Sequence, residues 1–383
     1  MHDRPANQYL DPPDGLSGAS APAARSVDTS PAEVATDRPD APLDEAANGS
    51  VIPEPDPLGR RFFNLRTLAS FAVGLVILGF VIGRSSEGVL ENLTRANPLY
   101  YLAALALYYL TFPIRALRWR KLLRNVGFLP AEGVKLPSLV GITEIILLSW
   151  FANCIVPAKL GDAYRAYLLK RNSRVSFSKT FGTILAERII DTLLLSVLLA
   201  LSTTLAFGSA LPGEIQTILL FGLALAAIVL IGLFSMRNFS RLITPLVPKR
   251  YRKHYVLFEA GTLGAFGVGR LPMIMLYSLM AWSIEAGRVY LVCLALGIPS
   301  IDWPIIVFVA LAAALLTTVP FTPAGLGLVE AGIVGTLVLA ANLNLVSGID
   351  ESLAKSVAIL DRTISYLSIV AVGAVVLLVS KRR

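Results

Sequence analysis

The sequence predicts an all-α polytopic membrane protein with an inverted-topology repeat. Of its 383 residues, 55% are hydrophobic and 16% are charged, whereas a soluble domain carries about a quarter charged residues. Apolar runs long enough for membrane helices follow one another along the chain. They lie near residues 65–83, 98–117, 138–156, 177–207, 215–236, 272–297, 303–320, 324–342 and 353–379. We expect about six full spans plus two re-entrant helical hairpins, or eight to nine spans if the hairpin legs cross fully.

The first 58 residues differ in composition from the rest. They hold eleven acidic residues and three arginines, so their net charge is −8, whereas residues 59–383 carry +16. They are poor in aromatic residues and cannot bury enough apolar surface to offset their chain entropy. We expect a disordered acidic cytoplasmic tail over 1–58 and an integral membrane domain over 59–383. No signal peptide is expected before the first apolar run, which should be a retained span.

Positive charge in the connections predicts their sidedness. Excess Lys and Arg places the N-terminal flank, the connections 118–135, 157–179 and 237–271, and the C-terminus in the cytoplasm. Connections 84–97, 207–215, 298–302 and 343–352 carry no such excess and are expected outside. The basic connection 237–271 is expected to lie on the membrane surface and to attract anionic lipids.

Two places do not fit simple crossings. Residues 138–156 are a single apolar run between two cytoplasmic connections, so the chain must return through the short segment after Pro157. The runs 303–320 and 324–342 lie between two outside connections and are joined at Pro323. We therefore expect one re-entrant hairpin entering from each side, although two thin full crossings would give the same sidedness.

The two bends resemble each other. "VPAKLGDAY" (156–164) aligns with "TPAGLGLVE" (322–330), and "LAERIID" (185–191) is echoed by "ILDRTIS" (359–365). Each unit is a span, a hairpin and a span, over about 98–207 and about 272–379, in opposite orientation. Inverted repeats with broken helices indicate a substrate site at the midplane of a transporter. Chance similarity of two Pro/Gly bends is the alternative.

Charged residues lie within the apolar runs, where each costs roughly 2.5 to 3.5 kcal/mol at a helix centre. Arg188 with Asp191, and Glu285 with Arg288, are spaced i,i+3 and can pair locally. Asp361 and Arg362 lie in the last run. These charges are either structural ion pairs between helices or part of a substrate path.

The bends favour an anionic ligand. The second leg of each hairpin begins near the midplane, where its first N–H groups lack intrahelical partners and its dipole is positive. Glycines 161, 325 and 327 would let a ligand approach the backbone. The candidate substrate-binding or translocation residues are Asn153, Pro157, Lys159, Gly161, Asp162, Arg165, Glu187, Arg188, Asp191, Glu285, Arg288, Pro323, Gly325, Gly327, Glu330, Asp361 and Arg362.

No nucleotide or metal chemistry is indicated. A phosphate-binding GxxxxGK[ST] motif does not occur, and the two cysteines and two histidines are not spaced as zinc ligands. We expect no catalytic residues, metal site, cofactor or nucleic-acid partner.

The segments "NCIVPAKLGDAYRAYLL", "AERIIDTLLL", "TPAGLGLVEAG" and "ILDRTISYL" resemble the membrane region of lysylphosphatidylglycerol synthases. That region also occurs alone, in the flippase-like UPF0104 membrane proteins, and the resemblance covers roughly residues 60–383. The family pattern at the first bend, with Arg and Glu, matches Lys159 and Asp162 here, which keep the charge but change the reach. The resemblance implies lipid translocation without lysyl transfer, in a bacterial plasma membrane, with both termini cytoplasmic.

Three functions remain open at this stage. The first is a flippase or scramblase for a phosphate-bearing lipid or lipid-linked headgroup. The second is an integral-membrane transferase acting on a lipid-linked donor, although the short outside connections leave little room for an acceptor. The third is a non-catalytic membrane partner of a lipid or cell-envelope synthase. Membrane lipids are the expected partners in all three.

Overall fold

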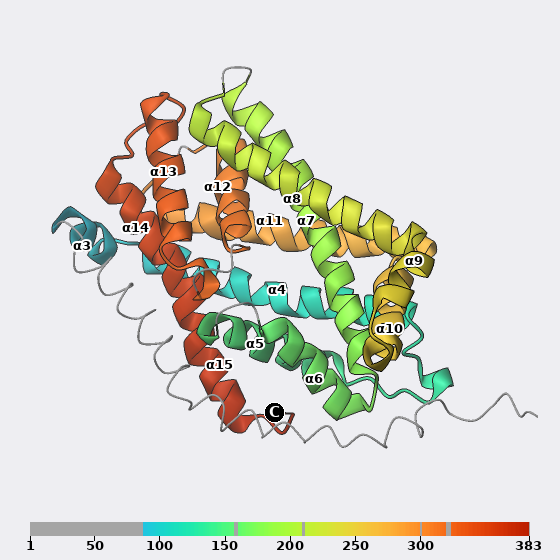
Figure 1. Cartoon of the computed structure of the whole chain (residues 1–383). Coiled ribbons are helices and arrows are strands. Elements are labelled where there is room, and N and C mark those ends of the chain that lie inside the picture. The colour runs from blue at the N-terminus through green and yellow to red at the C-terminus, as the bar shows by residue number, and fades with distance from the viewer. Residues whose placement is uncertain (1–86, 157–159, 209–210, 299–300, 319–322, 383) are drawn as a thin grey trace, which may run out of the picture. The chain divides into compact units, whose positions relative to one another are not determined.

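A computed structural model describes residues 87–382, apart from the short segments 157–159, 209–210, 299–300 and 319–322. Every regular element within these residues is helical (Figure 1). The all-α fold predicted from the sequence is therefore confirmed. The acidic tail and the first apolar run, 65–83, lie outside the described residues, as do Pro157 and Lys159.

The first half of the described chain contains one long helix, a helical hairpin and a second long helix. Short α3 precedes them, and a 3₁₀ turn (Pro130–Glu132) follows α4. The elements are α3 (Glu87–Thr94), α4 (Pro98–Asn125), α5 (Leu139–Ile155), α6 (Gly161–Ser173) and α7 (Phe177–Phe207). Helices α5 and α6 are the two legs of the hairpin.

Three helices connect the halves, namely α8 (Gly213–Asn238), α9 (Ser240–Leu246) and α10 (Lys249–Ala265). Buried residues on α8 are limited to Ile215 and Gly222, so its apolar side chains face outward, as in a helix facing lipid. Helix α10 packs on the first turns of α7, where a Cβ on Gly182 or Gly261 would overlap the partner backbone. The basic connection therefore contains a helix packed against the membrane domain.

The second half repeats the order of the first. A 3₁₀ turn (Val268–Arg270) leads into it, and another (Pro323–Gly325) forms the hairpin bend. The helices are α11 (Leu271–Ala295), α12 (Trp303–Leu316), α13 (Leu328–Asn342), α14 (Glu351–Arg362) and α15 (Ser368–Val379). A π-helical turn, Thr363–Leu367, joins α14 to α15 directly after Arg362. Such turns are frequently found at functional sites.

Four helices in the described chain are long and apolar enough to cross a membrane: α7, α8, α11 and the continuous helix Glu351–Val379. Helix α4 contains the predicted span 98–117 but is not among them. It has 28 residues, and its tyrosines and arginines lower its hydropathy. The hairpin legs have 17, 13, 14 and 15 residues, so at about 1.5 Å per residue they are shorter than a hydrocarbon core of about 30 Å.

The first helices of the two halves, α4 and α11, lie side by side and antiparallel (Figure 1). The Asn97 N–H donates to the carbonyl oxygen of Ala295 (2.7 Å), so the start of α4 meets the end of α11. At the other end, Arg270 Nη1 donates to Asn125 Oδ1 (3.0 Å). Equivalent helices running in opposite directions are what an inverted repeat requires.

The two hairpins enter from opposite ends of this helix pair. Glu144 near the start of α5 pairs with Arg382 (3.2 Å), and Asn172 near the end of α6 donates to the Arg382 carbonyl (3.2 Å). The start of α12 instead meets the end of α7, where the Phe207 and Phe308 rings are 5.3 Å apart. Both bends therefore point into the interior.

Candidate functional site

A cavity of about 220 Å³ lies where the two hairpins approach each other. Its wall combines residues from both halves, including Asn153 and Val156 of the first hairpin and Thr318 and Ala324 of the second. Seven charged residues line it, an unusual number within a bundle of apolar helices. They are Arg115, Arg188, Asp191, Glu285, Arg288, Asp361 and Arg362.

The rest of the cavity wall is mostly apolar. Leu195 of α7, Leu225 of α8, Trp282 of α11, Leu315 of α12 and Val329 of α13 contribute to it. Leu225 lies on α8, most of whose side chains face outward. A molecule in the cavity therefore meets charged and apolar groups, which suits an amphiphile.

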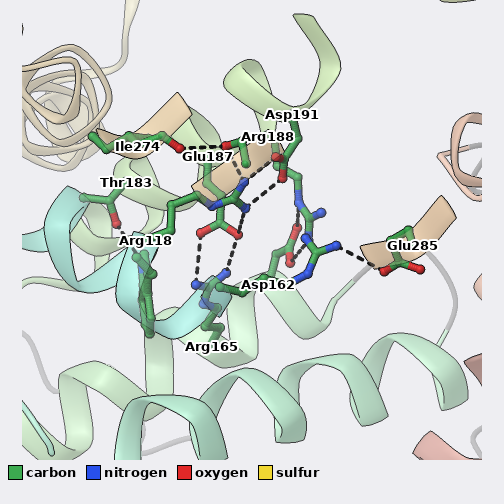
Figure 2. A network of polar contacts seen from close by, with 12 residues as sticks. Arg118, Asp162, Arg165, Thr183, Glu187, Arg188, Asp191, Ile274 and Glu285 are labelled. Atoms are coloured by element: carbon green, nitrogen blue, oxygen red, sulfur yellow. Dashed lines mark hydrogen bonds and ion pairs between the residues drawn. The ribbon is translucent and has the colours of Figure 1, made fainter. Parts of the chain in front are cut away.

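One ion cluster joins α4, α6 and α7 (Figure 2). Arg118 of α4 pairs with Glu187 (2.8 Å) and with both carboxylate oxygens of Asp191. Arg165 of α6 forms a second pair with Glu187, at 3.2 and 3.0 Å, and its guanidinium stacks over the Trp119 ring at 3.8 Å. These side chains are almost fully buried, so each charge depends on its partners.

A second contact in this half attaches the hairpin to α7. Arg188 Nε and Nη2 donate to the two oxygens of Asp162 at 2.9 and 2.8 Å, the bidentate arrangement that planar guanidinium and carboxylate groups favour. Asp162 lies in the first turn of α6. The Arg188 side chain is 35% exposed, and it lines the cavity.

The second half contains corresponding pairs. Arg288 of α11 donates to Asp361 of α14 and, at 3.3 and 3.2 Å, to Glu285. Arg362 Nε donates to Glu330 of α13 at 2.7 Å, and its Nη2 to the carbonyl oxygen of Ala324 at 2.9 Å. Arg362 thereby attaches α14 to the second hairpin, as Arg188 attaches α7 to the first.

The correspondence extends to α4 and α11. Residues Ile114–Arg118 (Ile-Arg-Ala-Leu-Arg) align with Ile284–Arg288 (Ile-Glu-Ala-Gly-Arg). Arg118 and Arg288 are therefore equivalent, and each pairs with the acid that immediately precedes the hairpin-binding arginine. The remaining aligned pair has opposite charges, Arg115 and Glu285, and these two side chains contact each other at 3.3 Å.

The helix starts at the bends are already capped by the protein. The Gly161 N–H donates to Asn153 Oδ1 (2.8 Å), and the Gly327 N–H donates to Glu330 Oε2 (2.7 Å). Of the orphan N–H groups expected to face an anion, these two are thus occupied. The cationic donors on the cavity wall are arginine side chains.

The bend glycines serve different purposes. A Cβ at Gly161 would overlap the carbonyl oxygen of Ser149 and lie 2.6 Å from Asn153 Oδ1, so this glycine lets α5 and α6 pack closely. At Gly161, the expected approach of a ligand to the backbone is therefore replaced by a helix–helix contact. Gly325 and Gly327 have φ angles of 71° and 85°, a backbone region that favours glycine.

Most of the predicted site residues converge, but some partners differ from expectation. The local pair of Glu285 with Arg288 is confirmed, and Glu187 pairs with Arg118 and Arg165. The local pairing of Arg188 with Asp191 is wrong, because Arg188 binds Asp162 and Asp191 binds Arg118. Pro323 lies in the 3₁₀ bend.

Sequence reasoning missed Arg115 and Arg118. Ending the span at residue 117 assigned Arg118 to a cytoplasmic loop, whereas α4 continues to Asn125 and buries it. The similarity of Ile114–Arg118 to Ile284–Arg288 was the signal that could have identified both residues.

The chain is similar in sequence to several known proteins. A UPF0104 membrane protein of Methanocaldococcus jannaschii, MJ1078, is 37% identical over 61% of this chain and 95% of its own length. Another UPF0104 membrane protein, PH1989 of Pyrococcus horikoshii, is 25% identical over 77% of this chain and 91% of its own. Glycosyltransferase AglD of Haloferax volcanii is 26% identical over 72% of this chain, but the match covers only 48% of AglD.

The family model described as the lysylphosphatidylglycerol synthase TM region matches residues 67–373, which include both hairpins and the cavity. The chain is a member of this membrane-protein family.

Proposed function

We propose that this protein is a lipid transporter, a flippase or scramblase that moves a phosphate-bearing lipid or lipid-linked headgroup across the membrane. The observation that carries the proposal is the cavity, whose wall contains four arginines beside apolar side chains. Guanidinium groups bind phosphate through parallel N–H donors, and the apolar wall matches an acyl or polyprenyl chain.

The arrangement of the repeats supports movement of the headgroup through the cavity. Antiparallel equivalents α4 and α11 flank it, and one hairpin from each end reaches it. Transporters built in this way expose a fixed central site to alternate sides by rocking one repeat against the other. The positive-inside pattern further favours a plasma membrane with both termini cytoplasmic.

The test is headgroup translocation in proteoliposomes with labelled lipids. The panel contains an anionic phosphodiester lipid, a polyprenyl phosphate and an uncharged diacylglycerol with matched tails. We expect faster translocation of one phosphate-bearing class over empty liposomes. No acceleration of any phosphate-bearing lipid by a folded protein would contradict the proposal.

A matched pair of variants connects transport to the cavity. The double variant Arg188→Gln with Asp162→Asn replaces an ion pair by a neutral hydrogen-bonding pair and removes one cation from the wall. We expect its transport rate to fall about tenfold or more, corresponding to about 1.4 kcal/mol. The control, Arg95→Gln with Glu91→Gln, neutralises an exposed pair far from the cavity and should transport normally.

The relative AglD favours a second candidate. Its name assigns glycosyl transfer, so a membrane transferase that uses a lipid-linked donor, or a membrane partner of such an enzyme, is the alternative. The match leaves about half of AglD uncovered, which is why we rank transport first. Turnover of a radiolabelled lipid-linked sugar donor by the purified protein would establish the transferase instead.

A further inference from the structure

The buried pair Arg115–Glu285 is the one aligned position at which the two repeats carry opposite charges. Three other aligned positions carry the same sign in both repeats: Arg118 with Arg288, Glu187 with Asp361, and Arg188 with Arg362. Both members of the pair line the cavity, and each comes from one of the two antiparallel helices. The mismatch therefore places a carboxylate in the cavity wall between two guanidinium groups, Arg115 and Arg288.

Glu285 is held more loosely than the other cavity carboxylates. Its contacts are 3.3 Å to Arg115 and 3.3 and 3.2 Å to Arg288. Among the described residues, the other carboxylates that line the cavity have closer contacts: Asp191 accepts from Arg118 Nη2 at 2.9 Å, and Asp361 accepts from Arg288 Nη1 at a shorter distance than any contact of Glu285. Ion-pair hydrogen bonds are strongest at about 2.7–2.9 Å. Glu285 is thus the carboxylate that an incoming anion displaces most easily.

Arg115 also has donors to spare. Within the described part of the chain, its guanidinium makes one hydrogen bond, to Glu285, and its buried Nε has no partner. The faces of Trp150 and Trp282 lie 5.0 and 5.9 Å away and hold the group by cation–π contact. The Trp282 Nε1 donor, also on a residue of the cavity wall, is buried and has no hydrogen-bond partner among the described residues. A buried unpaired donor costs about 1–3 kcal/mol, so these groups favour an acceptor with more oxygens than one carboxylate offers.

We propose that Glu285 is an internal stand-in for the phosphate of the cargo, and that the phosphate binds between Arg115 and Arg288 by displacing it. This inference rests on the proposed function and names the anion subsite within the cavity. A phosphodiester or phosphomonoester has more acceptor oxygens than a carboxylate and can engage Arg115, Arg288 and Trp282 Nε1 together. Without cargo, Glu285 keeps the two arginines paired.

The stand-in also provides a route for release. When the phosphate leaves, the carboxylate returns to the arginines, which avoids leaving two buried cations unpaired. Site occupancy is then an exchange of one anion for another. The charged and titratable groups around Glu285 are Arg115 and Tyr108 of α4, Arg288 of α11 and Asp361 of α14.

The test is lipid binding to the full-length protein in nanodiscs. The probe is a short-chain phosphatidylglycerol with a fluorescent acyl chain, and the reference is a diacylglycerol with the same chains. We expect Glu285→Gln to bind the anionic probe about tenfold tighter than wild type or more, the low end of couplings measured for close charge pairs. Binding of the uncharged reference should not change.

Two further variants make the result specific. Glu144→Gln removes the same charge from a pair outside the cavity and should bind the anionic probe like wild type. Arg115→Gln combined with Glu285→Gln restores a neutral pair and should lose the gain. If Glu285→Gln alone does not fold, two other variants replace it. One is the double variant Arg115→Gln with Glu285→Gln, which contains a neutral pair, and the other is Glu285→Asp, which keeps the charge on a shorter side chain. The double variant should then bind more weakly than Glu285→Asp.

The outcomes separate this inference from the proposed function. If wild type prefers the anionic probe but Glu285→Gln binds it no tighter, the stand-in role is wrong and the lipid site stands. If wild type prefers neither the phosphatidylglycerol probe nor a labelled polyprenyl phosphate over an uncharged lipid with the same chains, the proposed function fails with it. Millimolar inorganic phosphate should not displace the lipid probe; full displacement would assign the subsite to free phosphate and overturn the lipid assignment.

Discussion

The two halves of the membrane domain contain ion clusters that differ in charge balance. The first half pairs three arginines with three acids, namely Arg118, Arg165 and Arg188 with Asp162, Glu187 and Asp191. The second half has two arginines for three acids, namely Arg288 and Arg362 with Glu285, Glu330 and Asp361. Arg115 of the first half supplies the missing cation.

The two clusters also differ in how many of their charges line the cavity. Three residues of the balanced cluster, Arg118, Arg165 and Glu187, are buried and do not line the cavity. In the second half, Glu285, Arg288, Asp361 and Arg362 all line it. We infer that the first cluster mainly fixes the helices and the second mainly meets the cargo.

The largest effect is expected for Arg118→Gln. The change leaves both Glu187 and Asp191 short of a cation in a buried setting, so stability should fall by about 3–5 kcal/mol. The thermal midpoint in detergent measures it, with Arg95→Gln, whose pair with Glu91 is exposed, as the control. An unchanged midpoint would contradict a structural role for the balanced cluster.

The two arginine contacts that hold the hairpins should respond unequally to neutralisation. Glu330 and Arg362 are 9% and 4% exposed, whereas Asp162 and Arg188 are 14% and 35% exposed. Glu330→Gln also weakens the cap on α13 and should cost about 3 kcal/mol. Asp162→Asn should cost about 1 kcal/mol, because solvent screens its partner.

Chemical denaturation of both variants in one detergent measures this ordering of the hairpin contacts. Equal losses, or a larger loss for Asp162→Asn, would show that burial does not control these contacts.

The next largest difference in stability is expected between alanine variants of the two bend glycines, Gly161 and Gly327, because alanine meets a different obstacle at each. At Gly161 the new methyl group overlaps the Ser149 carbonyl, so we expect a loss of about 2–3 kcal/mol and a separated hairpin. At Gly327 nothing lies nearby, and only the positive φ of 85° costs, by about 1–2 kcal/mol. Gly232→Ala on α8, which meets open space, is the control. Thermal midpoints that place Gly327→Ala below Gly161→Ala would reverse this argument.

The smallest effect concerns the N-terminal caps of α7 and α14, the helices that follow the two hairpins. Ser176 caps α7 with a neutral hydroxyl, whereas Asp350 caps α14 with a carboxylate. Hydrogen bonds from the Leu353 N–H and the Ser352 hydroxyl lower the pKa of Asp350. This contribution is therefore complete above the unfolded pKa of about 3.9 and is lost as the pH falls through the lower folded value.

Removing the charged cap tests this pH dependence. We expect Asp350→Ala to cost about 0.5–1 kcal/mol at pH 7 and less near pH 3. Ser176→Ala should cost a similar amount at both pH values. Thermal midpoints between pH 3 and pH 7 measure both, and a constant loss for Asp350→Ala would show that the charge contributes nothing.

The helices and their order along the chain could be predicted from local sequence patterns. Apolar runs, the Pro/Gly bends and the recurrence of an acid followed by Arg are local features, so they identified α-helices, two short-legged hairpins and a repeated unit. Helix length and hydropathy depend on neighbouring residues, which is why this part was predictable. The end of α4 could not be predicted in this way. An arginine at the end of an apolar run suggests that the chain has entered a loop, unless its buried partners are known.

The pairing of the buried charges depends on how the helices pack in three dimensions. Arg188 binds Asp162, 26 residues away, although Asp191 is one turn away, and Arg288 binds Asp361, 73 residues away. A buried ion pair is stable only when its geometry and remaining hydrogen bonds are satisfied, and helix packing sets that geometry. The same packing brings Arg115 and Glu285 from two antiparallel helices into one cavity wall, a juxtaposition that no local pattern contains.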